Sequence, residues 1–250
     1  MSAATRLASM ASGLEAVILA GGLGTRLRGV LDDRPKVLAP IGDKPFLDHL
    51  LRALALAGTE RVLLCLGHLA DKVVAHLAAN PPPLPVDWII EPKPLGTGGA
   101  LRLARPRLGQ RLALVMNGDT WIGFDLAGLR RRLAESAAPG ALVYAQVPDV
   151  SRFGRLELDR DGYIAAFHEK DPTTTGAGII NGGVYLLSTA LLDRLAASEA
   201  VSLERDFLEK LPPRSLAAFR ADGAFIDIGT PESLAAAPAI IGGDAFGRAT

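Results

Sequence analysis

The sequence predicts an α/β protein with a Rossmann-like, doubly wound, mainly parallel mixed sheet. Two observations lead to this class. Short aliphatic or β-branched runs alternate with longer segments of helical period up to about residue 146, and a hairpin-like pattern replaces this alternation afterwards. Alternation of this kind is typical of βαβ units around a parallel sheet.

The first half of the chain contains the alternating elements. Strands are expected at residues 16–19, 61–66, 86–90, 112–116 and 141–146. Helices are expected at residues 46–57, 71–79, 99–105 and 125–136. These segments place apolar residues at steps of three and four, as helices that cover a sheet do.

The second half predicts antiparallel structure. Asp161-Gly162 favours a tight turn between strands at 154–158 and 163–169. Further expected elements are a strand at 182–187, helices at 189–197 and 204–211, strands at 216–220 and 224–228, and a helix that begins near Thr230 and Pro231. This antiparallel insertion is expected over the strand ends, where open α/β sheets bind ligands.

Composition narrows the class of partner and compartment. The chain has 250 residues, with 27 Lys+Arg against 27 Asp+Glu, so no overall field attracts nucleic acid or an anionic membrane. The single cysteine, Cys65, excludes an internal disulfide and is expected to be a buried thiol. Residues 1–13 lack the apolar core of a signal peptide. A cytoplasmic protein is expected.

A glycine-rich segment follows the first expected strand. Residues 19–27 read Leu-Ala-Gly-Gly-Leu-Gly-Thr-Arg-Leu, and Arg34-Pro35-Lys36 comes soon after. Glycines allow successive backbone N–H groups to approach anionic oxygens. The pattern is neither a Walker A loop, which needs Gly-Lys-Ser/Thr, nor a dinucleotide fingerprint, which needs Gly or Ala at Leu27. With the cations Arg26 and Lys36, it predicts a loop that binds phosphates.

Two aspartates are candidates for a magnesium site. Asp119 follows the strand expected at 112–116, and a carboxylate at such a strand end suits Mg²⁺ beside phosphates, although a turn aspartate has the same pattern. Asp227 lies between two isoleucines, where an unpaired carboxylate is costly to bury. The hypothesis requires both acids and the glycine loop to meet in one pocket.

These motifs together resemble the signature of the sugar-1-phosphate nucleotidyltransferases, from about residue 15 to residue 238. The resemblance implies a nucleotide-diphospho-sugar transferase-like fold of GT-A type and a Mg²⁺ cofactor bound by Asp119 and Asp227. It also implies one domain over 14–240, with a nucleotide-binding part (14–146), a sugar-binding part (147–230), a disordered tail (1–13) and a loose tail (241–250).

The family's residue roles carry over onto matching positions. Arg26 and Lys36 are expected to be catalytic through the triphosphate. Nucleotide binding falls to Leu19, Ala20, Gly21, Gly22, Gly24, Thr25, Glu91, Gly96 and Thr97. Binding of the sugar phosphate falls to Asn117, Gly154, Glu169, Lys170 and Asn181.

The base is predicted from one carboxylate. Glu91 can accept both the N1–H and the exocyclic amine of guanine, whereas uracil or thymine offers a single imide N–H. Glu91 therefore favours GTP, although an exposed Glu before Pro is commonly just solvated surface.

Within the family, residues 202–208 and 222–232 look most like those of the D-glycero-α-D-manno-heptose 1-phosphate guanylyltransferases. A mannose-1-phosphate guanylyltransferase and a uridylyltransferase acting on another sugar 1-phosphate stay open. So does a different class, a non-catalytic nucleotide-sensing regulator. The resemblance also suggests a homodimer.

Overall fold

The fold is described from a computed structural model that covers residues 13–27, 29–31, 33–168, 171 and 173–241. The tails expected at 1–13 and 241–250 lie outside these residues, except for Gly13 and Ile241. Within the described part of the chain, no helix has the length and apolar character needed to cross a membrane.

A nine-stranded sheet forms the centre of the molecule. Four of its strands are parallel and neighbour one another in the order β5 (Val86–Ile90), β4 (Arg61–Leu66), β1 (Glu15–Ala20) and β6 (Leu112–Asn117). Their lengths match the expected strands to within two residues at each end. Leu19 of β1 is level with Asn117 of β6, so the segments that follow both strands begin side by side.

The antiparallel part continues the same sheet. Strand β11 (Gly178–Ser188) pairs antiparallel with β6 on one side and with β8 (Gly140–Val147) on the other, and β12 (Leu216–Arg220) extends β8. The hairpin expected around Asp161-Gly162 is present as β9 (Arg155–Leu158) and β10 (Ile164–His168). The expected insertion is therefore joined to the main sheet through β11.

A β-bulge interrupts β11 at the Asn-Gly-Gly run. The pairing with β8 shifts between Asn181 and Val184, and Gly183 has φ +69°, a left-handed conformation that favours glycine. The Asn181 carbonyl oxygen Oδ1 accepts a hydrogen bond from the Gly183 N–H at 2.9 Å. The bulge thus fixes the direction of the Asn181 side chain.

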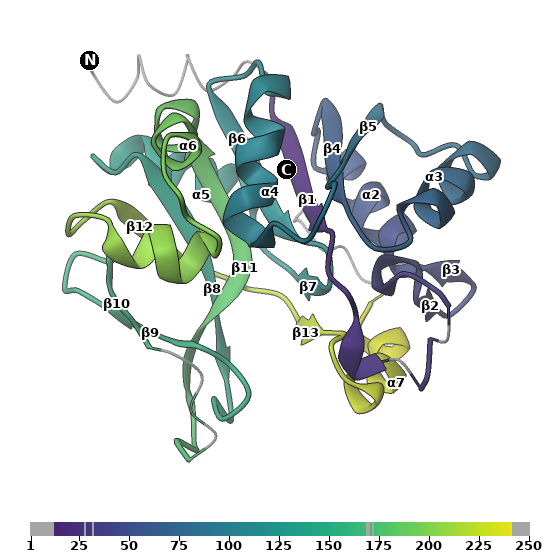
Figure 1. The fold of residues 1–250 in the computed structure, drawn as a ribbon. Helices are drawn as coiled ribbons and strands as arrows, with labels where there is room; N and C mark the ends of the chain where they lie inside the picture. Colours follow the sequence, from purple (N-terminus) through teal and green to yellow (C-terminus); the bar gives the residue numbers. More distant parts are fainter. Residues whose placement is uncertain (1–12, 28, 32, 169–170, 172, 242–250) are drawn as a thin grey trace.

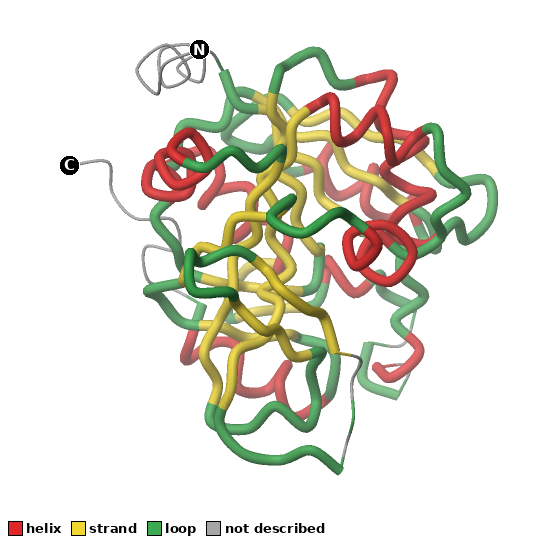
Figure 2. Tube along the Cα trace, turned by 90° about the vertical axis from the view of Figure 1, so that its left-hand side faces the viewer, coloured by secondary structure: helices red, strands yellow, loops and turns green. Residues whose placement is uncertain are grey.

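Helices cover both faces of the sheet, as Figure 2 shows. Along β1, Ala16 and Ile18 belong to one apolar cluster and Val17 to the other, so this strand is buried on both sides. The first cluster is completed by α2 (Phe46–Leu56), α3 (Ala70–Ala79), α5 (Leu126–Glu135) and α7 (Pro231–Ile240). The second is completed by α4 (Gly96–Ala104) and α6 (Thr189–Ala196).

Short elements complete the chain. They are η1 (Thr25–Leu27), η2 (Lys36–Leu38), β2 (Pro40–Ile41), β3 (Lys44–Pro45), η3 (Arg105–Arg107) and β7 (Thr120–Ile122) in the first half, and η4 (Leu203–Phe207), η5 (Leu208–Lys210) and β13 (Phe225–Asp227) in the second. β13 pairs with β7, so that Asp227 lies opposite Thr120. Figure 1 shows β13 and α7 at the lower end of the molecule, next to the segment that follows β1.

The segment expected as a helix at 204–211 is helical, but it is not an α-helix. Residues 203–207 form a π-helical turn, followed by a 3₁₀ turn at 208–210. The Asp206 carboxylate accepts hydrogen bonds from the N–H groups of Val201 and Ser202, and Pro212 follows directly after Leu211. The side-chain bonds hold the entry of the segment, and proline limits its length.

Candidate active site

The loop after β1 brings the backbone close to the neighbouring strands. A Cβ on Gly21 would collide with Oε1 of Glu91, and a Cβ on Gly67, after β4, would lie 2.7 Å from the Gly21 carbonyl oxygen. After β6, the Gly118 N–H donates to the Leu19 carbonyl at 2.9 Å. Glycine at these positions allows three strand ends to close around one space.

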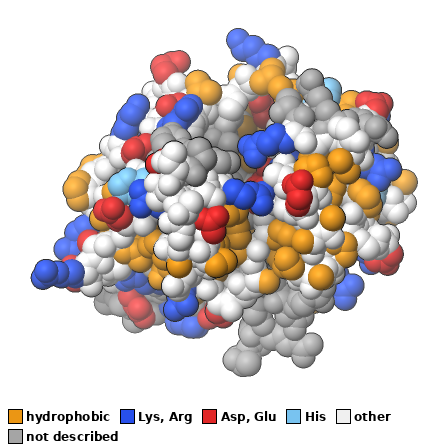
Figure 3. Space-filling model, turned by 90° about the horizontal axis from the view of Figure 1, so that it is seen from below, with side chains coloured by type: hydrophobic (Ala, Val, Ile, Leu, Met, Phe, Trp, Pro, Cys, Tyr) orange, Lys and Arg blue, Asp and Glu red, His pale blue; other side chains and the backbone are white. Residues whose placement is uncertain are grey.

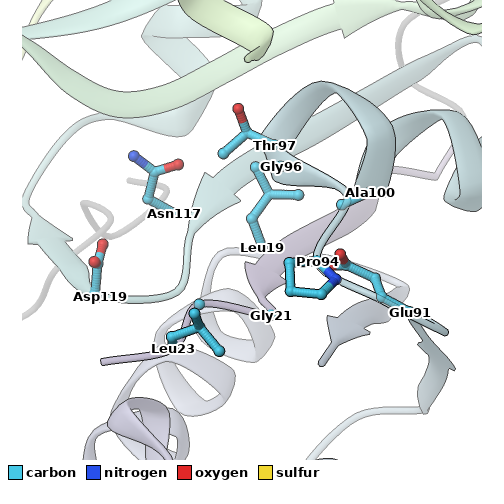
Figure 4. A pocket seen from close by; sticks show the side chains of 11 residues that line it. Leu19, Gly21, Leu23, Glu91, Pro94, Gly96, Thr97, Ala100, Asn117 and Asp119 are labelled. Atoms are coloured by element: carbon cyan, nitrogen blue, oxygen red, sulfur yellow. The ribbon is translucent and has the colours of Figure 1, made fainter. Parts of the chain in front are cut away.

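That space is a pocket of about 300 Å³. Figure 4 shows Glu91 at one end and Asp119 at the other, with Gly21 and Leu19 along the floor between them. Thr97 and Asn117 complete its opposite wall. The first pocket, as we name it, thus lies where the parallel strands end and the glycine loop begins.

Lys36 and two aspartates meet beside this pocket. The Lys36 ammonium donates to Oδ2 of Asp119 at 2.7 Å, and the Ile228 N–H donates to the Asp119 carbonyl at 2.9 Å. A Cβ on Gly229 would lie 3.2 Å from the Lys36 Nζ, which places Lys36 next to the Asp227 strand as well. In Figure 3, which views the molecule from below, basic and acidic side chains lie next to each other near the middle of the face.

The charges of this cluster affect the pKa of Asp227. Burial raises the pKa of Asp227, and the charge on Asp119 raises it further, while Lys36, the Gly229 N–H and Arg26 oppose the rise. The Gly229 N–H donates to Asp227 Oδ1 at 2.7 Å. The two carboxylates therefore lie close enough for their charges to interact, with Lys36 beside them.

The two aspartates fit a hard divalent cation. Mg²⁺ prefers carboxylate oxygens and is commonly held by one or two carboxylates together with substrate phosphates. A cation between Asp119 and Asp227 would remove the repulsion that raises the Asp227 pKa. Among the described residues, no group of three or more His, Cys, Asp or Glu side chains is arranged to hold a metal.

Glu91 is oriented by the backbone of the following turn. Its Oε2 accepts a hydrogen bond from the Leu95 N–H at 2.9 Å, and its Oε1 lies over Gly21. Burial raises the pKa of Glu91, and the bond from Leu95 partly offsets that rise. Glu91 is therefore a preoriented acceptor at the end of the pocket farthest from Asp119.

A second pocket, of about 390 Å³, shares Asn117 with the first. The hairpin and the bulge contribute Gly154 and Asn181 to its wall, and the η4 segment contributes Glu204. The Asn117 oxygen Oδ1 is buried and has no hydrogen-bond partner in the described structure. Asn117 therefore offers an acceptor at the boundary between the two pockets.

The structure places the predicted residues in several locations. Leu19, Gly21, Gly22, Glu91, Gly96, Thr97, Asn117 and Asp119 line the first pocket, and Asn117, Gly154 and Asn181 line the second. Gly24 and Lys36 line a neighbouring hollow on the outer side of the loop, together with Gly22. Ala20 ends β1 and lines none of these pockets. Arg26 is exposed on η1, and its charge lowers the pKa of Asp227. Thr25 begins η1, while Glu169 and Lys170 lie outside the described residues.

Thr97 differs from the expectation in one respect. It lines the first pocket, but its hydroxyl accepts from the Leu203 N–H at 2.8 Å and donates to Glu204 Oε2 at 3.2 Å. Its hydroxyl thus already has partners in the protein. The first turn of α4, expected to recognise the base, is also a packing surface for the chain around Val201, because the Gly98 N–H donates to the Val201 carbonyl at 2.8 Å.

Sequence reasoning missed several residues of the second pocket. They are Leu156, Phe167, His168, Ser202, Glu204, Arg205 and Glu209. Their positions span both strands of the hairpin and the η4–η5 segment, which no local motif connects. Residues 202–208 were noted for their family resemblance, but not as part of a site.

Comparison with known proteins agrees with this arrangement. D-glycero-alpha-D-manno-heptose 1-phosphate guanylyltransferases from Aneurinibacillus thermoaerophilus and Campylobacter jejuni are 36% and 35% identical to this chain, each over 88% of it and over 94% and 96% of their own lengths. The solved structure of HddC from Yersinia pseudotuberculosis complexed with GMP-PN superposes with a TM-score of 0.78 at 37% identity, covering 90% of this chain and 98% of that one.

The family model described as nucleotidyl transferase matches residues 15–242. The match contains β1 and the glycine loop at its start and β13 and α7 at its end. Members of this family generally use a divalent metal. The chain therefore belongs to the nucleotidyl transferase family.

Proposed function

We propose that this protein transfers GMP from GTP to D-glycero-α-D-manno-heptose 1-phosphate, forming GDP-heptose and pyrophosphate. The observation that carries the proposal is the meeting of the glycine loop, Lys36, Asp119 and Asp227 beside a pocket that ends at Glu91. The two heptose 1-phosphate guanylyltransferases that match almost over their full lengths support the choice of base and sugar.

In this proposal the first pocket binds GTP and the second binds the sugar phosphate. GTP would place its base near Glu91 and Gly96 and its phosphates along the glycine loop towards Lys36. The sugar would enter the second pocket, with Gly154 and Asn181, and its phosphate would approach past Asn117. The expected division into a nucleotide-binding part at 14–146 and a sugar-binding part at 147–230 belongs to the same proposal.

The chemistry needs little from a general base. A phosphate monoester has a second pKa of about 6, so the sugar phosphate is largely dianionic at neutral pH and is already nucleophilic. One of its oxygens attacks the α-phosphorus of GTP in line, the bond to the bridging oxygen breaks, and pyrophosphate leaves. The protein's task is therefore to align both substrates and to neutralise charge.

Charge neutralisation falls to residues at the end of the pocket opposite Glu91. Lys36 and Arg26 supply positive charge to the triphosphate, and the Gly21 and Gly22 backbone allows its close approach. Asp119 and Asp227 would hold Mg²⁺, which when bound screens the phosphate oxygens and stabilises the leaving pyrophosphate. Lys36 would exchange part of its contact with Asp119 for a phosphate oxygen.

The test is a pyrophosphate-release assay with Mg²⁺, a panel of nucleoside triphosphates and several sugar 1-phosphates. The proposal expects the highest kcat/KM with GTP and the heptose 1-phosphate. A higher value with mannose 1-phosphate would favour the mannose-1-phosphate guanylyltransferases, one of which, from Mycobacterium tuberculosis, is 35% identical over 79% of this chain and 55% of its own length. A higher value with UTP would contradict the guanine assignment.

Binding of nucleotide without pyrophosphate release from any pair would indicate a nucleotide-sensing regulator instead. The presence of Arg26, Lys36, Asp119 and Asp227 argues against that class, because a sensor needs no second carboxylate for turnover. A homodimer stays a proposal, which light scattering of the purified protein tests directly.

A further inference from the structure

A chain of hydrogen bonds links the second pocket to the first. It starts at Asn181 in the bulge of β11, whose Nδ2 donates to the Tyr185 hydroxyl at 2.8 Å. The Tyr185 hydroxyl donates to Glu204 Oε1 at 2.8 Å. Glu204 Oε2 accepts from the Thr97 hydroxyl at 3.2 Å, and Thr97 lines the first pocket. Three segments that are distant in the sequence are thus joined through one carboxylate.

The burial of Tyr185 determines which group donates in its hydrogen bond with Glu204. Tyr185 is fully buried at the centre of β11, and burial together with the charge on Glu204 raises its pKa well above the ordinary value. The phenol therefore keeps its proton, and its O–H donates a hydrogen bond to Glu204. The same oxygen accepts a hydrogen bond from Asn181, so the Tyr185 hydroxyl is used both as a donor and as an acceptor.

Backbone packing presses the two pockets together at the same place. A Cβ on Gly98 would lie 2.8 Å from the Ala200 carbonyl oxygen, and one on Gly96 would collide with the Val201 carbonyl. The Leu203 N–H donates to the Thr97 hydroxyl at 2.8 Å. The first turn of α4 and the segment that leads into η4 are therefore packed directly against each other.

The conformation of η4 is itself unusual. Residues 203–207 form a π-helical turn, and single π turns are rare and are found frequently at functional sites. Here the turn places Glu204 between the Tyr185, Thr97 and Ser202 hydroxyls, with the Ser202 Oγ at 3.2 Å from Glu204 Oε2. A carboxylate that accepts from three neutral hydroxyls holds all three in fixed positions.

We propose that Glu204 is a positioning residue that couples the two substrate pockets, so that occupation of one favours occupation of the other. Glu204 fixes Thr97 on the wall of the nucleotide pocket and, through Tyr185, fixes Asn181 on the wall of the sugar pocket. This inference rests on the proposed function. Thermodynamic linkage then requires each substrate to tighten the binding of the other by the same factor.

The test uses the full chain with Mg²⁺ and measures the Kd of the heptose 1-phosphate by calorimetry, with and without a GTP analogue that cannot be cleaved at the α-phosphorus. The coupling factor is the ratio of these two Kd values. We expect Thr97→Val, which keeps the shape and removes the hydroxyl, to lower the factor about ten-fold, as the loss of a hydrogen bond to a charged group implies. Thr97→Ser should retain it.

Glu204→Gln and Tyr185→Phe should lower the same factor. Glu204→Gln replaces one carboxylate oxygen with an amide group that cannot accept, and Tyr185→Phe removes the bonds to both Asn181 and Glu204, while each change preserves size. Glu199→Gln is the matched control, since Glu199 is an exposed carboxylate close by in the same segment. It should keep the wild-type factor and unfold at the wild-type temperature.

Two results overturn the inference. One is a wild-type coupling factor in both Thr97→Val and Glu204→Gln. The other is a lower unfolding temperature in these variants with unchanged coupling, which assigns the chain of bonds to stability alone. Should one variant not fold, Tyr185→Phe supplies the same comparison. A wild-type protein that turns over no sugar phosphate overturns the proposed function instead, and its Kd values still decide the coupling.

Discussion

The two pockets are built from different parts of the chain. The first is built largely from backbone, with glycines at positions where a Cβ would collide with neighbouring atoms, as at Gly21 and Gly67. The second is built from side chains that already bond to one another, among them Asn181 and Glu204. The glycines leave room for a ligand to approach the backbone of the first pocket, whereas side chains form most of the wall of the second.

The comparison predicts the largest losses where the first pocket meets its charges. Lys36→Ala and Asp227→Ala should each lower kcat about 10³-fold, since each removes charge stabilisation from the reacting phosphates. Pyrophosphate release at saturating substrates measures the effect. Lys44→Ala, at an exposed lysine on β3, is the control. Equal loss in Lys44→Ala would show that charge in general, and not this site, matters.

The next largest effect is expected from a glycine substitution that should change the KM for one substrate and not for the other. Gly21→Ala should raise the KM for GTP about 10- to 100-fold, because the new Cβ collides with Glu91 Oε1 and displaces it. The KM for the sugar phosphate should change far less. Gly109→Ala has no atom within 4 Å of its Cβ and serves as control. A parallel rise of both KM values would contradict a nucleotide role for the first pocket.

The pH dependence of Glu91 sharpens the assignment of the base. Because burial raises its pKa, the carboxylate that accepts from guanine is lost as pH falls through that raised value, at a higher pH than for an ordinary glutamate. The KM for GTP should therefore rise on acidification. Glu91→Gln should have a flat profile over this range and lose about ten-fold in its preference for GTP over UTP. An unchanged preference assigns the base to other groups.

The smallest expected effect lies at the opposite end of β1, away from both pockets. Glu15 is buried, yet bonds from the Gln110 and Gly109 N–H groups and from Arg61 outweigh burial and lower its pKa. Glu15→Gln should cost about 1–3 kcal/mol of unfolding free energy at neutral pH. Because the folded-state pKa is the lower one, this difference should shrink as pH falls below the unfolded value of 4.5. Urea unfolding at pH 7 and pH 3 measures it, and kcat should stay unchanged.

The same contrast explains which parts of the fold could be predicted. The buried strand β4 is an almost continuous apolar run, and β5 is a short run rich in β-branched residues at the edge of the sheet; the bounds of both were predicted to the residue. α4 begins three residues earlier than expected, since its first turn contains glycines that weaken the helical pattern. β2, β3 and β7 have two or three residues each and carry no pattern of their own. The π turn depends on side-chain bonds of Asp206 and Thr97, which periodicity does not reveal.

The candidate site divides in the same way. A loop that binds phosphates through its backbone needs several glycines close together in the sequence, so the glycine loop could be predicted. Asp119 could be predicted because it directly follows an expected strand. The bonds of Tyr185, Glu204 and Thr97 join three distant segments. Each of these residues is ordinary in its own local context, and only the packing of η4 on α4 gives them a common role.

The pairing of β13 with β7 has a consequence for biosynthesis. The strand that carries Asp227 is translated after almost every other element, yet it lies next to Lys36, which is translated among the first. A nascent chain on the ribosome can therefore contain the glycine loop and Asp119 while it lacks the second carboxylate. The second carboxylate of the candidate metal site is therefore in place only after the last strand of the chain has been made.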